Sequence, residues 1–566
     1  MTDMSRQVYR GDELRPADEA ILLPVPASPG RVSVFEVVLV TILTLVAVAR
    51  VCATYRQVGQ TFDEPVHLAA GIELLDRGHY TINLMHPPLS RLPLAIGPFL
   101  DGVRSTGAAD AFEEGNILLW DRGQYLRTLT LARLGSLPFL VLAIVATWWF
   151  ARSIFGPRAA GVAAALFSLL PPVLGHAGLA TTDMSITAVI PLVLATSVKW
   201  LDNPGPVQTL KLGVLTGAAV LVKFSALVFI PLMVALSLAA KLSIEAGTPD
   251  EKVRRWRRLE VPTGAVLMLV ACTVWAGYGF SVGALRDIET LSLGSSVLVS
   301  AHVLPAPAFW RGLFILVGYN EYHVQPVTAL QQAQLRFGHA WYFFPLAIGV
   351  KTPLGFLVFA VIGMGFSVRQ AWRTRRWQWA VPSVVIVGML LVLSRSQINI
   401  GLRHVLPLYP LLATVAAVGL LALWDAPSSI IRRSGRAVAI VLTGWLCVAS
   451  VRAHPDYLAS FNEVVGHHPE RFLLDSDLDW GQDIQRLSDT LKARGIDSVA
   501  VYLHGLTNER QLATVKHLVI EPPGPQTGWV AASAYAIYAR PRLDWLQHRT
   551  PTAKIGTSIW LYHLAR

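Results

Sequence analysis

Long apolar segments with few charged residues set the strongest limit on how this chain can fold. A helix needs about 20 apolar residues to cross the hydrocarbon core of a bilayer. Nine such segments occur, at residues 32–50, 134–151, 159–175, 184–200, 261–281, 352–368, 377–394, 405–424 and 437–452. A further apolar stretch, 211–241, is too long for one span and has Lys223 in its middle, so we predict a hairpin of two spans there. The sequence therefore predicts a mainly α polytopic membrane protein of about 11 transmembrane helices.

Composition agrees with this prediction. Of the 566 residues, 53% are hydrophobic and only 15% are charged, and the mean hydropathy is +0.47. The cysteines, Cys52, Cys272 and Cys447, lie far apart, which argues against a disulfide framework or a CxxC metal site. Residues 1–31 are polar and show no removable signal peptide, so we expect a disordered cytoplasmic tail and a first span that acts as its own anchor.

The distribution of basic residues orients the spans. The net charge of +11 comes from 48 Lys and Arg against 37 Asp and Glu. The basic segments are the N-terminal tail and residues 152–158, 199–211, 252–258, 369–376 and 432–436. With 11 spans all of these fall on the side of the N-terminus, which the positive-inside rule assigns to the cytoplasm. The excess of positive charge thus reflects topology, and no nucleic-acid partner is needed to explain it.

This topology places three substantial pieces outside an inner (plasma) membrane: the loops 52–133 and 282–340 and the tail 454–566. Apolar residues recur at helical spacing in the first loop, which predicts helices along the membrane surface. The tail combines an expected helix at 482–494 with the strand-like runs "SVAVYL", "HLVI" and "GWVAASAYAIY". We therefore predict a transmembrane domain at 32–453 and a small extracytoplasmic α/β domain at 454–566.

Ionisable residues gather at the outer ends of the predicted spans. They are Asp63, Glu64, His86, Arg133, Asp183, Lys351, Arg403 and His404. A charge at the centre of a bilayer costs about 2.5–3.5 kcal/mol, less toward the edge, so each needs a reason. Structural explanations exist for each: the acids could cap helices, the arginines could be interfacial anchors, and His86 could be a turn residue. Together, however, both signs of charge at one membrane face indicate a binding or catalytic site.

Several motifs, in this order, resemble the polyprenyl-phosphate-dependent membrane glycosyltransferases: glycosyltransferase family 39, with the protein O-mannosyltransferases and lipid A aminoarabinose transferases. The motifs are "FDEPVHLAAG" (62–71), "HPPLSRLPLAI" (86–96) and "GHAGLATTDMS" (175–185). Segments typical of the bacterial branch follow, namely "VKTPLGFL", "NIGLRHVLPLYPLL", "HPDYLASFNEVVG" and "DSDLDWGQDIQRL". The resemblance extends from about residue 35 to residue 566.

The resemblance implies the class C glycosyltransferase fold and a role for each matching residue. Asp63 matches the general base of the family and Glu64 its acidic neighbour. Arg133 matches a phosphate-contacting arginine, and Asp183 an acidic site residue. His86 stands where some relatives have a basic residue.

The expected chemistry is an inverting single displacement on a lipid-linked sugar. Asp63 would take the proton of an acceptor hydroxyl, while Arg133, Lys351 and Arg403 would neutralise the departing phosphate. Fixed cations can replace a metal, so we expect no obligatory metal cofactor, with a divalent cation as the alternative. No Walker or GxGxxG motif occurs, and a site outside the cytoplasm has no nucleotide sugars, which favours a polyprenyl-phosphate donor.

Other functions stay open at this point. A transporter or flippase for a lipid-linked glycan would also gather charges among helices, but near mid-membrane and within inverted repeats. A ligase acting on lipid-diphosphate glycans would need to bind two phosphates. The sequence does not identify the sugar, nor whether the acceptor is a protein, a lipid or a polysaccharide.

Overall fold

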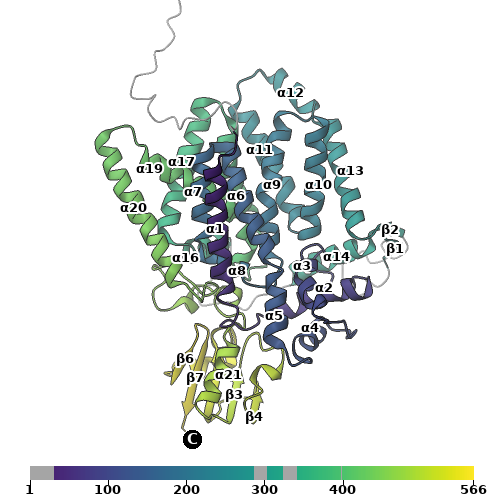
Figure 1. Cartoon of the computed structure of the whole chain (residues 1–566), viewed down its shortest axis with the longest axis vertical. Helices are drawn as coiled ribbons and strands as arrows, with labels where there is room; N and C mark the ends of the chain where they lie inside the picture. The colour runs from purple at the N-terminus through teal and green to yellow at the C-terminus, as the bar shows by residue number, and fades with distance from the viewer. Residues whose placement is uncertain (1–30, 286–302, 323–340, 397, 566) are drawn as a thin grey trace, which may run out of the picture.

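A bundle of long helices with a small sheet domain at one end makes up the molecule (Figure 1). The computed structural model describes residues 31–285, 303–322, 341–396 and 398–565. The predicted N-terminal tail lies outside these residues except for Arg31, as do 286–302 and 323–340 of the second predicted outer loop.

The helices of the bundle match the predicted spans. Eight are long and apolar enough to cross a membrane within the described ranges: α1 (Val34–Cys52), α5 (Tyr125–Leu134) joined to α6 (Leu137–Phe155), α9 (Asp183–Asp202), α11 (Ala226–Ile244), α13 (Glu260–Gly277), α17 (Leu354–Thr374), η4 (Leu406–Leu408) joined to α19 (Tyr409–Trp424), and α20 (Ser429–Arg452). A ninth is the pair α7 (Pro157–Ser168) and α8 (Pro171–Ala177), bent by 65°. The two remaining predicted spans are shorter apolar helices, α10 (Pro206–Val222), and η2 (Trp377–Ala380) joined to α18 (Val381–Leu393).

Two interruptions of these helices shape the end of the bundle that carries the site. Pro171 and Pro172 have no N–H to continue α7, so the chain bends there and starts α8. The predicted hairpin at 211–241 is formed by α10 and α11, and Lys223 between them is extended, with φ −159° and ψ 136°. The break places the lysine side chain at the end of the bundle, where it pairs with Asp183.

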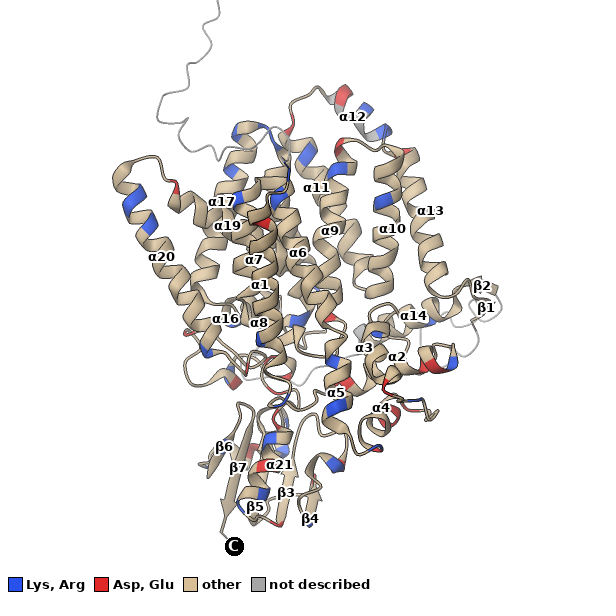
Figure 2. Ribbon diagram, in the orientation of Figure 1, with Lys and Arg blue, Asp and Glu red and all other residues tan. Residues whose placement is uncertain are grey.

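The two ends of the bundle differ in charge. Lys and Arg residues are frequent at the end where α12 (Pro249–Arg257) lies, and the sheet domain lies at the opposite end (Figure 2). The first predicted outer loop lies at the sheet-domain end and contains α2 (Glu64–Arg77), α3 (Arg91–Leu100) and α4 (Ala111–Trp120), as its helical spacing predicted (Figure 1). Of the second loop the structure describes β1 (Val282–Ala284), β2 (Val303–Pro305) and α14 (Pro307–Tyr322), and α16 (Phe343–Lys351) follows the loop.

The C-terminal domain is the predicted α/β unit. Its five-stranded sheet has the order β4-β3-β5-β7-β6, in which β4 and β5 pair with β3 in parallel and β7 pairs with β5 and β6 antiparallel. The strands are β3 (Ser498–Tyr502), β4 (His517–Ile520), β5 (Gly528–Ser533), β6 (Ala553–Ile555) and β7 (Ile559–Leu564). The helix α21 (Ile484–Ala493) covers the sheet through Leu487 and Leu491, which are fully buried.

One part of the strand prediction was wrong. The run "GWVAASAYAIY" is a strand only as far as Ser533, and its second half forms the helix α22 (Ala534–Ala539). Alanine is the best helix former and alternates here with aromatic residues, a pattern that the period of two alone does not separate from a strand. The strands β6 and β7 were not predicted at all.

Candidate active site

The acidic pair at the start of α2 divides into a buried and an accessible carboxylate. The side chain of Glu64 is 1% exposed and that of Asp63 is 26% exposed. Successive residues of a helix point about 100° apart, so the two carboxylates face different partners. Glu64 points into the bundle, whereas Asp63 faces the loop between α18 and α19.

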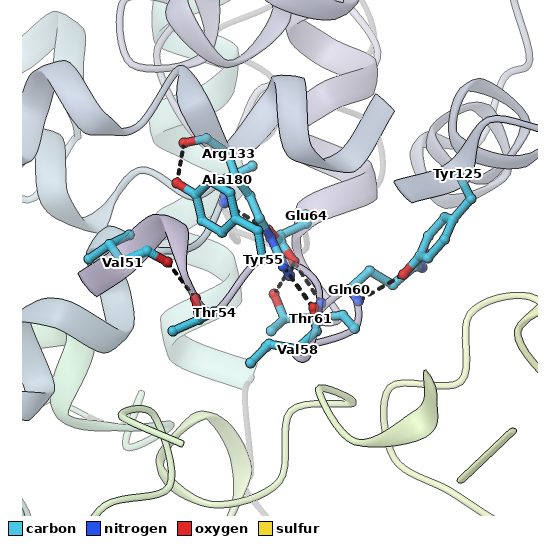
Figure 3. Close-up of polar contacts among 11 residues, drawn as sticks. Val51, Thr54, Tyr55, Val58, Gln60, Thr61, Glu64, Tyr125, Arg133 and Ala180 are labelled. Atoms are coloured by element: carbon cyan, nitrogen blue, oxygen red, sulfur yellow. Dashed lines mark hydrogen bonds and ion pairs between the residues drawn. The ribbon is translucent and has the colours of Figure 1, made fainter. Parts of the chain in front are cut away.

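Glu64 forms a closed ion pair with Arg133 of α5 (Figure 3). The Arg133 Nε and Nη2 atoms each lie 2.8 Å from a different oxygen of Glu64. The same carboxylate also accepts hydrogen bonds from the backbone N–H groups of Ala180 and Thr61, both at 2.8 Å. These contacts satisfy a charge that would otherwise be costly to bury.

Arg133 is equally enclosed, which differs from the expected phosphate contact. Besides Glu64, its guanidinium donates to the carbonyl oxygens of Val58 at 2.8 Å and Gly59 at 2.7 Å. The residue has no exposed surface. Arg133 and Glu64 therefore hold the segment before α2 in place, and neither side chain is open to a substrate.

Asp63 makes an ion pair with Arg403, 340 residues further along the chain. The Arg403 Nη1 atom lies 2.5 Å from Asp63 Oδ2. Asp63 precedes α2 as its N-cap, yet its side chain makes no capping hydrogen bond. Helix capping therefore does not explain why a carboxylate stands at this position. No described residue bonds to the other oxygen, Oδ1, which leaves it available to a ligand.

Arg403 lies in η3 (Leu402–His404), and several charges converge on it. Its guanidinium carbon is 4.4 Å from the centre of the Trp480 ring, and its Nε has no hydrogen-bond partner among the described residues. Burial lowers the pKa of Arg403, but the carboxylates of Asp63, Asp183 and Asp475 outweigh it and hold that pKa above its usual range. Arg403 is thus a fixed cation between carboxylates of three separate segments.

Asp183, the first residue of α9, pairs with a cation that the sequence did not identify as a site residue. The Lys223 Nζ atom lies 2.6 Å from Asp183 Oδ1, and the side chains are 12% and 3% exposed. Asp183 caps no helix, because the N-cap position of α9 belongs to Thr182. The signal for Lys223 was present as a lone charge inside a 31-residue apolar stretch, but it was used only to predict the hairpin.

The two predicted histidines lie beside these ion pairs in an uncharged form. His86 Nδ1 is 3.1 Å from the Thr182 hydroxyl, next to Asp183. Burial lowers the pKa of both His86 and His404 well below the usual range for histidine. His404 Nε2 and His176 Nδ1 are buried without a hydrogen-bond partner among the described residues. Unsatisfied buried groups of this kind call for a missing partner, such as water or a ligand.

Lys351 does not join this group, although the sequence placed it with the phosphate ligands. Its ammonium donates to the carbonyl oxygens of Leu458 at 2.7 Å and Asp477 at 2.5 Å, and lies 4.0 Å from the Phe461 ring centre. Lys351 is 2% exposed. It therefore fastens the C-terminal segment to α16 and does not face Asp63.

The arrangement supplies an accessible carboxylate beside fixed cations. In the parts of the chain that the structure describes, no group of three or more His, Cys, Asp and Glu residues is placed to hold a metal ion. The expectation of no obligatory metal stays a prediction. What the geometry does provide is one accessible carboxylate, Asp63, next to Arg403, with Lys223 and Asp183 close by.

Comparisons with known proteins agree with this reading of the fold. Residues 127–249 match the family model described as dolichyl-phosphate-mannose-protein mannosyltransferase. No curated protein sequence matches the chain.

Solved structures that are similar to most of the chain include the following two. The apo oligosaccharyltransferase of Archaeoglobus fulgidus is 13% identical, and the match covers 92% of this chain and 74% of that one with a TM-score of 0.50. ArnT from Cupriavidus metallidurans, bound to undecaprenyl phosphate, is 14% identical, with 92% and 97% covered and a TM-score of 0.48. The chain has the class C glycosyltransferase fold, and its residues 127–249 match the dolichyl-phosphate-mannose-protein mannosyltransferase family.

Proposed function

We propose that this protein is a membrane glycosyltransferase that moves a sugar from a polyprenyl-phosphate carrier to an acceptor hydroxyl, with Asp63 as the general base. The observation that carries the proposal is the position of Asp63: an accessible carboxylate whose Oδ2 is held by Arg403 and whose Oδ1 faces no described partner. The matched family supports a lipid-phosphate sugar as the donor, since its description names dolichyl-phosphate-mannose.

The reaction needs a base on one side of the sugar and positive charge on the other. Asp63 Oδ1 accepts the proton of the acceptor hydroxyl, whose oxygen forms a bond to the anomeric carbon while the bond from that carbon to the phosphate oxygen breaks. The anomeric carbon is thereby inverted. The phosphate leaves with the bonding electrons, and its charge must be stabilised as it develops.

The structure changes the set of cations proposed for that phosphate. Lys223 joins Arg403 in place of Lys351 and Arg133, because the latter two are saturated by carbonyl oxygens and by Glu64. Uncharged His404 and His86 are suited to donating hydrogen bonds, not to supplying charge. Asp183 orients the Lys223 ammonium through their ion pair until the lipid phosphate competes for it.

The side of the membrane on which the site lies is inferred from the distribution of basic residues. The site lies at the end of the bundle that carries the sheet domain, away from the basic loops (Figure 2). We place this end outside an inner membrane and the N-terminus in the cytoplasm, by the positive-inside rule. Charges at one end of the bundle also fit a transferase better than a flippase, which would need them along a path through it.

Turnover of a polyprenyl-phosphate sugar by the purified protein tests the proposal. A donor with a radiolabelled sugar is incubated with wild type and with Asp63→Asn, and release of lipid phosphate is measured. Loss of a general base is expected to slow release about 10²–10⁴-fold. Asp497→Asn, at an exposed ion pair with Lys516, is the matched control and should behave as wild type. Equal release by the wild type and Asp63→Asn would remove Asp63 from this role.

A further inference from the structure

A segment of the C-terminal domain, residues 475–483, is built into the candidate site. On one side it pairs with the segment before α2, where the N–H of Phe62 donates to the Trp480 carbonyl at 3.0 Å. On the other side the N–H of Leu402 donates to the Asp477 carboxylate at 3.1 Å. The segment therefore lies between the loop of Asp63 and the loop of Arg403, and it fixes the distance between them.

Two glycines allow this close fit. Gly481 and Gly505 have φ angles of 94° and 81°, in the left-handed region. A Cβ on Gly505 would lie 2.6 Å from the Gly481 Cα, so the two backbones touch directly. This contact holds the turn carrying His504 against the turn carrying Trp480.

Asp475, at the start of this segment, is a second carboxylate within the electrostatic influence of Arg403. Its backbone has a φ of 48°, an unfavourable conformation for a residue other than glycine. Such strain tends to be kept at functional sites. The carboxylate accepts the Ser476 N–H at 2.6 Å and lies 4.0 Å from His504 Nε2, and the side chain is 18% exposed. Asp475 is thus reachable from outside, as Asp63 is.

Aromatic rings border the two carboxylates. The His504 ring stacks on Tyr535 at 4.0 Å between ring centres, and on Phe62 at 5.7 Å. The hydroxyl of Tyr319, on α14, lies within the electrostatic influence of Asp63, Arg403 and Asp475. Rings from the first loop, from α14 and from the C-terminal domain therefore lie near Asp63 and Asp475.

We propose that the C-terminal domain forms the acceptor-binding wall of the site, where Asp475 binds hydroxyl groups of a neutral carbohydrate acceptor. This inference rests on the proposed function. The lipid donor must reach the site from the bundle, where Lys223 lies, so the acceptor enters from the side that the C-terminal domain covers. Above its pKa of about 7 the Asp475 carboxylate is charged, so it and Asp63 repel an anionic acceptor, whereas neighbouring hydroxyls of a sugar can donate to both. Aromatic rings beside them suit the apolar C–H faces of a sugar ring.

The dependence of the transfer rate on acceptor concentration, measured for the Asp475→Asn variant, tests the inference. The full-length purified protein is given an undecaprenyl-phosphate donor with a radiolabelled sugar, and transfer to methyl α-mannopyranoside is followed at increasing concentrations. Binding of undecaprenyl phosphate alone is measured in parallel. For Asp475→Asn we expect the half-saturating acceptor concentration to rise about tenfold, as for loss of one charge-assisted hydrogen bond. Affinity for undecaprenyl phosphate should stay within about twofold, which also shows that the site is folded.

Control variants and alternative acceptors separate the outcomes. Asp497→Asn, on the exposed surface of the same domain, should leave both quantities unchanged, and Tyr535→Leu should weaken acceptor saturation without affecting lipid binding. Unchanged acceptor dependence in Asp475→Asn, or an equal loss of lipid binding, would overturn the inference. Transfer to a Ser/Thr peptide but not to the glycoside would overturn the acceptor class. A wild-type protein that releases no sugar from any polyprenyl-phosphate donor would instead contradict the proposed function.

Discussion

At the scale of single residues, adjacent carboxylates have separate tasks because their surroundings differ. Glu64 accepts hydrogen bonds from Arg133 and from two backbone N–H groups, and it is sealed from solvent. Asp63 has one partner, Arg403, and keeps one oxygen open. Burial with full hydrogen bonding makes a carboxylate structural, whereas an incompletely satisfied one at the surface of a pocket can exchange protons.

The lysine found in the structure, Lys223, and the one predicted from the sequence, Lys351, should respond differently to substitution. Lys223→Met removes the partner of Asp183, and we expect undecaprenyl phosphate to bind at least about tenfold more weakly. Lys351→Met removes two hydrogen bonds to backbone carbonyls, so it should lower the stability by about 1–3 kcal/mol instead. Lipid binding and thermal unfolding in detergent check the pair. Equal loss of lipid binding in both variants would contradict this division.

Asp479 should make the stability depend on pH. It is 1% exposed, its Oδ2 accepts the Tyr535 N–H at 2.8 Å, and its Oδ1 has no partner among the described residues. Burial raises its pKa to about 7. A raised pKa stabilises the protonated form, so this contribution is complete below about pH 4, the unfolded-state value, and is lost as pH rises through 7. Between these two pH limits the free energy of unfolding falls by about 4 kcal/mol at most.

Thermal unfolding between pH 5 and pH 8 measures this effect. Wild type should lose stability across the range, and Asp479→Asn should show a shallower slope. Some slope should persist, because burial also raises the pKa of Asp475 to about 7. A variant with the full slope of the wild type would show that Asp479 is not responsible.

The sequence predicted this site only in part, and the reason lies in side-chain direction. Hydropathy shows which end of a span a residue occupies, and this brought Asp63, Asp183 and Arg403 to the same end. It does not show where a side chain points, so Arg133 and Lys351 were assigned to the phosphate although they face inward. Lys223 was interpreted only as a signal of topology.

At the scale of elements, the close contact between the helices α17 and α19 depends on glycine. A Cβ on Gly363 of α17 would lie 1.7 Å from the Val415 carbonyl oxygen of α19, and one on Gly419 would lie 2.0 Å from the Phe359 carbonyl oxygen. Small residues allow such close packing between membrane helices. The helices α17 and α19 can therefore approach backbone to backbone, and α19 follows directly from the turn that carries Arg403.

Alanine substitutions at Gly363, which faces α19, and at Gly365, which does not, test this contact. Gly363→Ala must push α19 away, and we expect a loss of about 1–3 kcal/mol or more. Gly365→Ala, two residues further along, meets no atom within 4 Å and should be neutral or stabilising by up to about 1 kcal/mol, because alanine favours the helix. Thermal unfolding of the two variants gives the comparison. Similar stabilities would mean that the helices can separate at little cost.

The elements themselves were predictable to different degrees. Spans were found because the length of an apolar helix is fixed by the bilayer, and even the hairpin at Lys223 was confirmed. In the C-terminal sheet β4 was predicted although it is mostly exposed, but β6, with only three residues, and β7 were missed. The strand β7 pairs with β5, which lies about 25 residues earlier, and β6 pairs with β7. Local sequence patterns do not report such pairing.

At the scale of the whole molecule, the site exists only because distant parts of the chain meet. Asp63 comes from the first loop, Lys223 from the α10–α11 turn, Arg403 from the turn before α19, and Asp475 from the C-terminal domain. The domain is fastened to the bundle through Lys351 and through the paired backbones of residues 59–62 and 480–482. The site is therefore complete only when the C-terminal domain is docked on the bundle.

The two ends of the molecule should lie on opposite sides of a membrane, and thiol labelling tests this directly. Glu509 is exposed in the C-terminal domain, and Arg433 is exposed in the basic segment at the start of α20, at the other end of the bundle. After replacement of the native cysteines, Glu509→Cys in intact cells should react with a membrane-impermeant maleimide, whereas Arg433→Cys should react only after lysis. The physical reason is the excess of Lys and Arg around Arg433, which resists translocation. Labelling of Arg433→Cys in intact cells, with Glu509→Cys protected, would invert the orientation and place the proposed site in the cytoplasm, where a nucleotide sugar becomes available as donor.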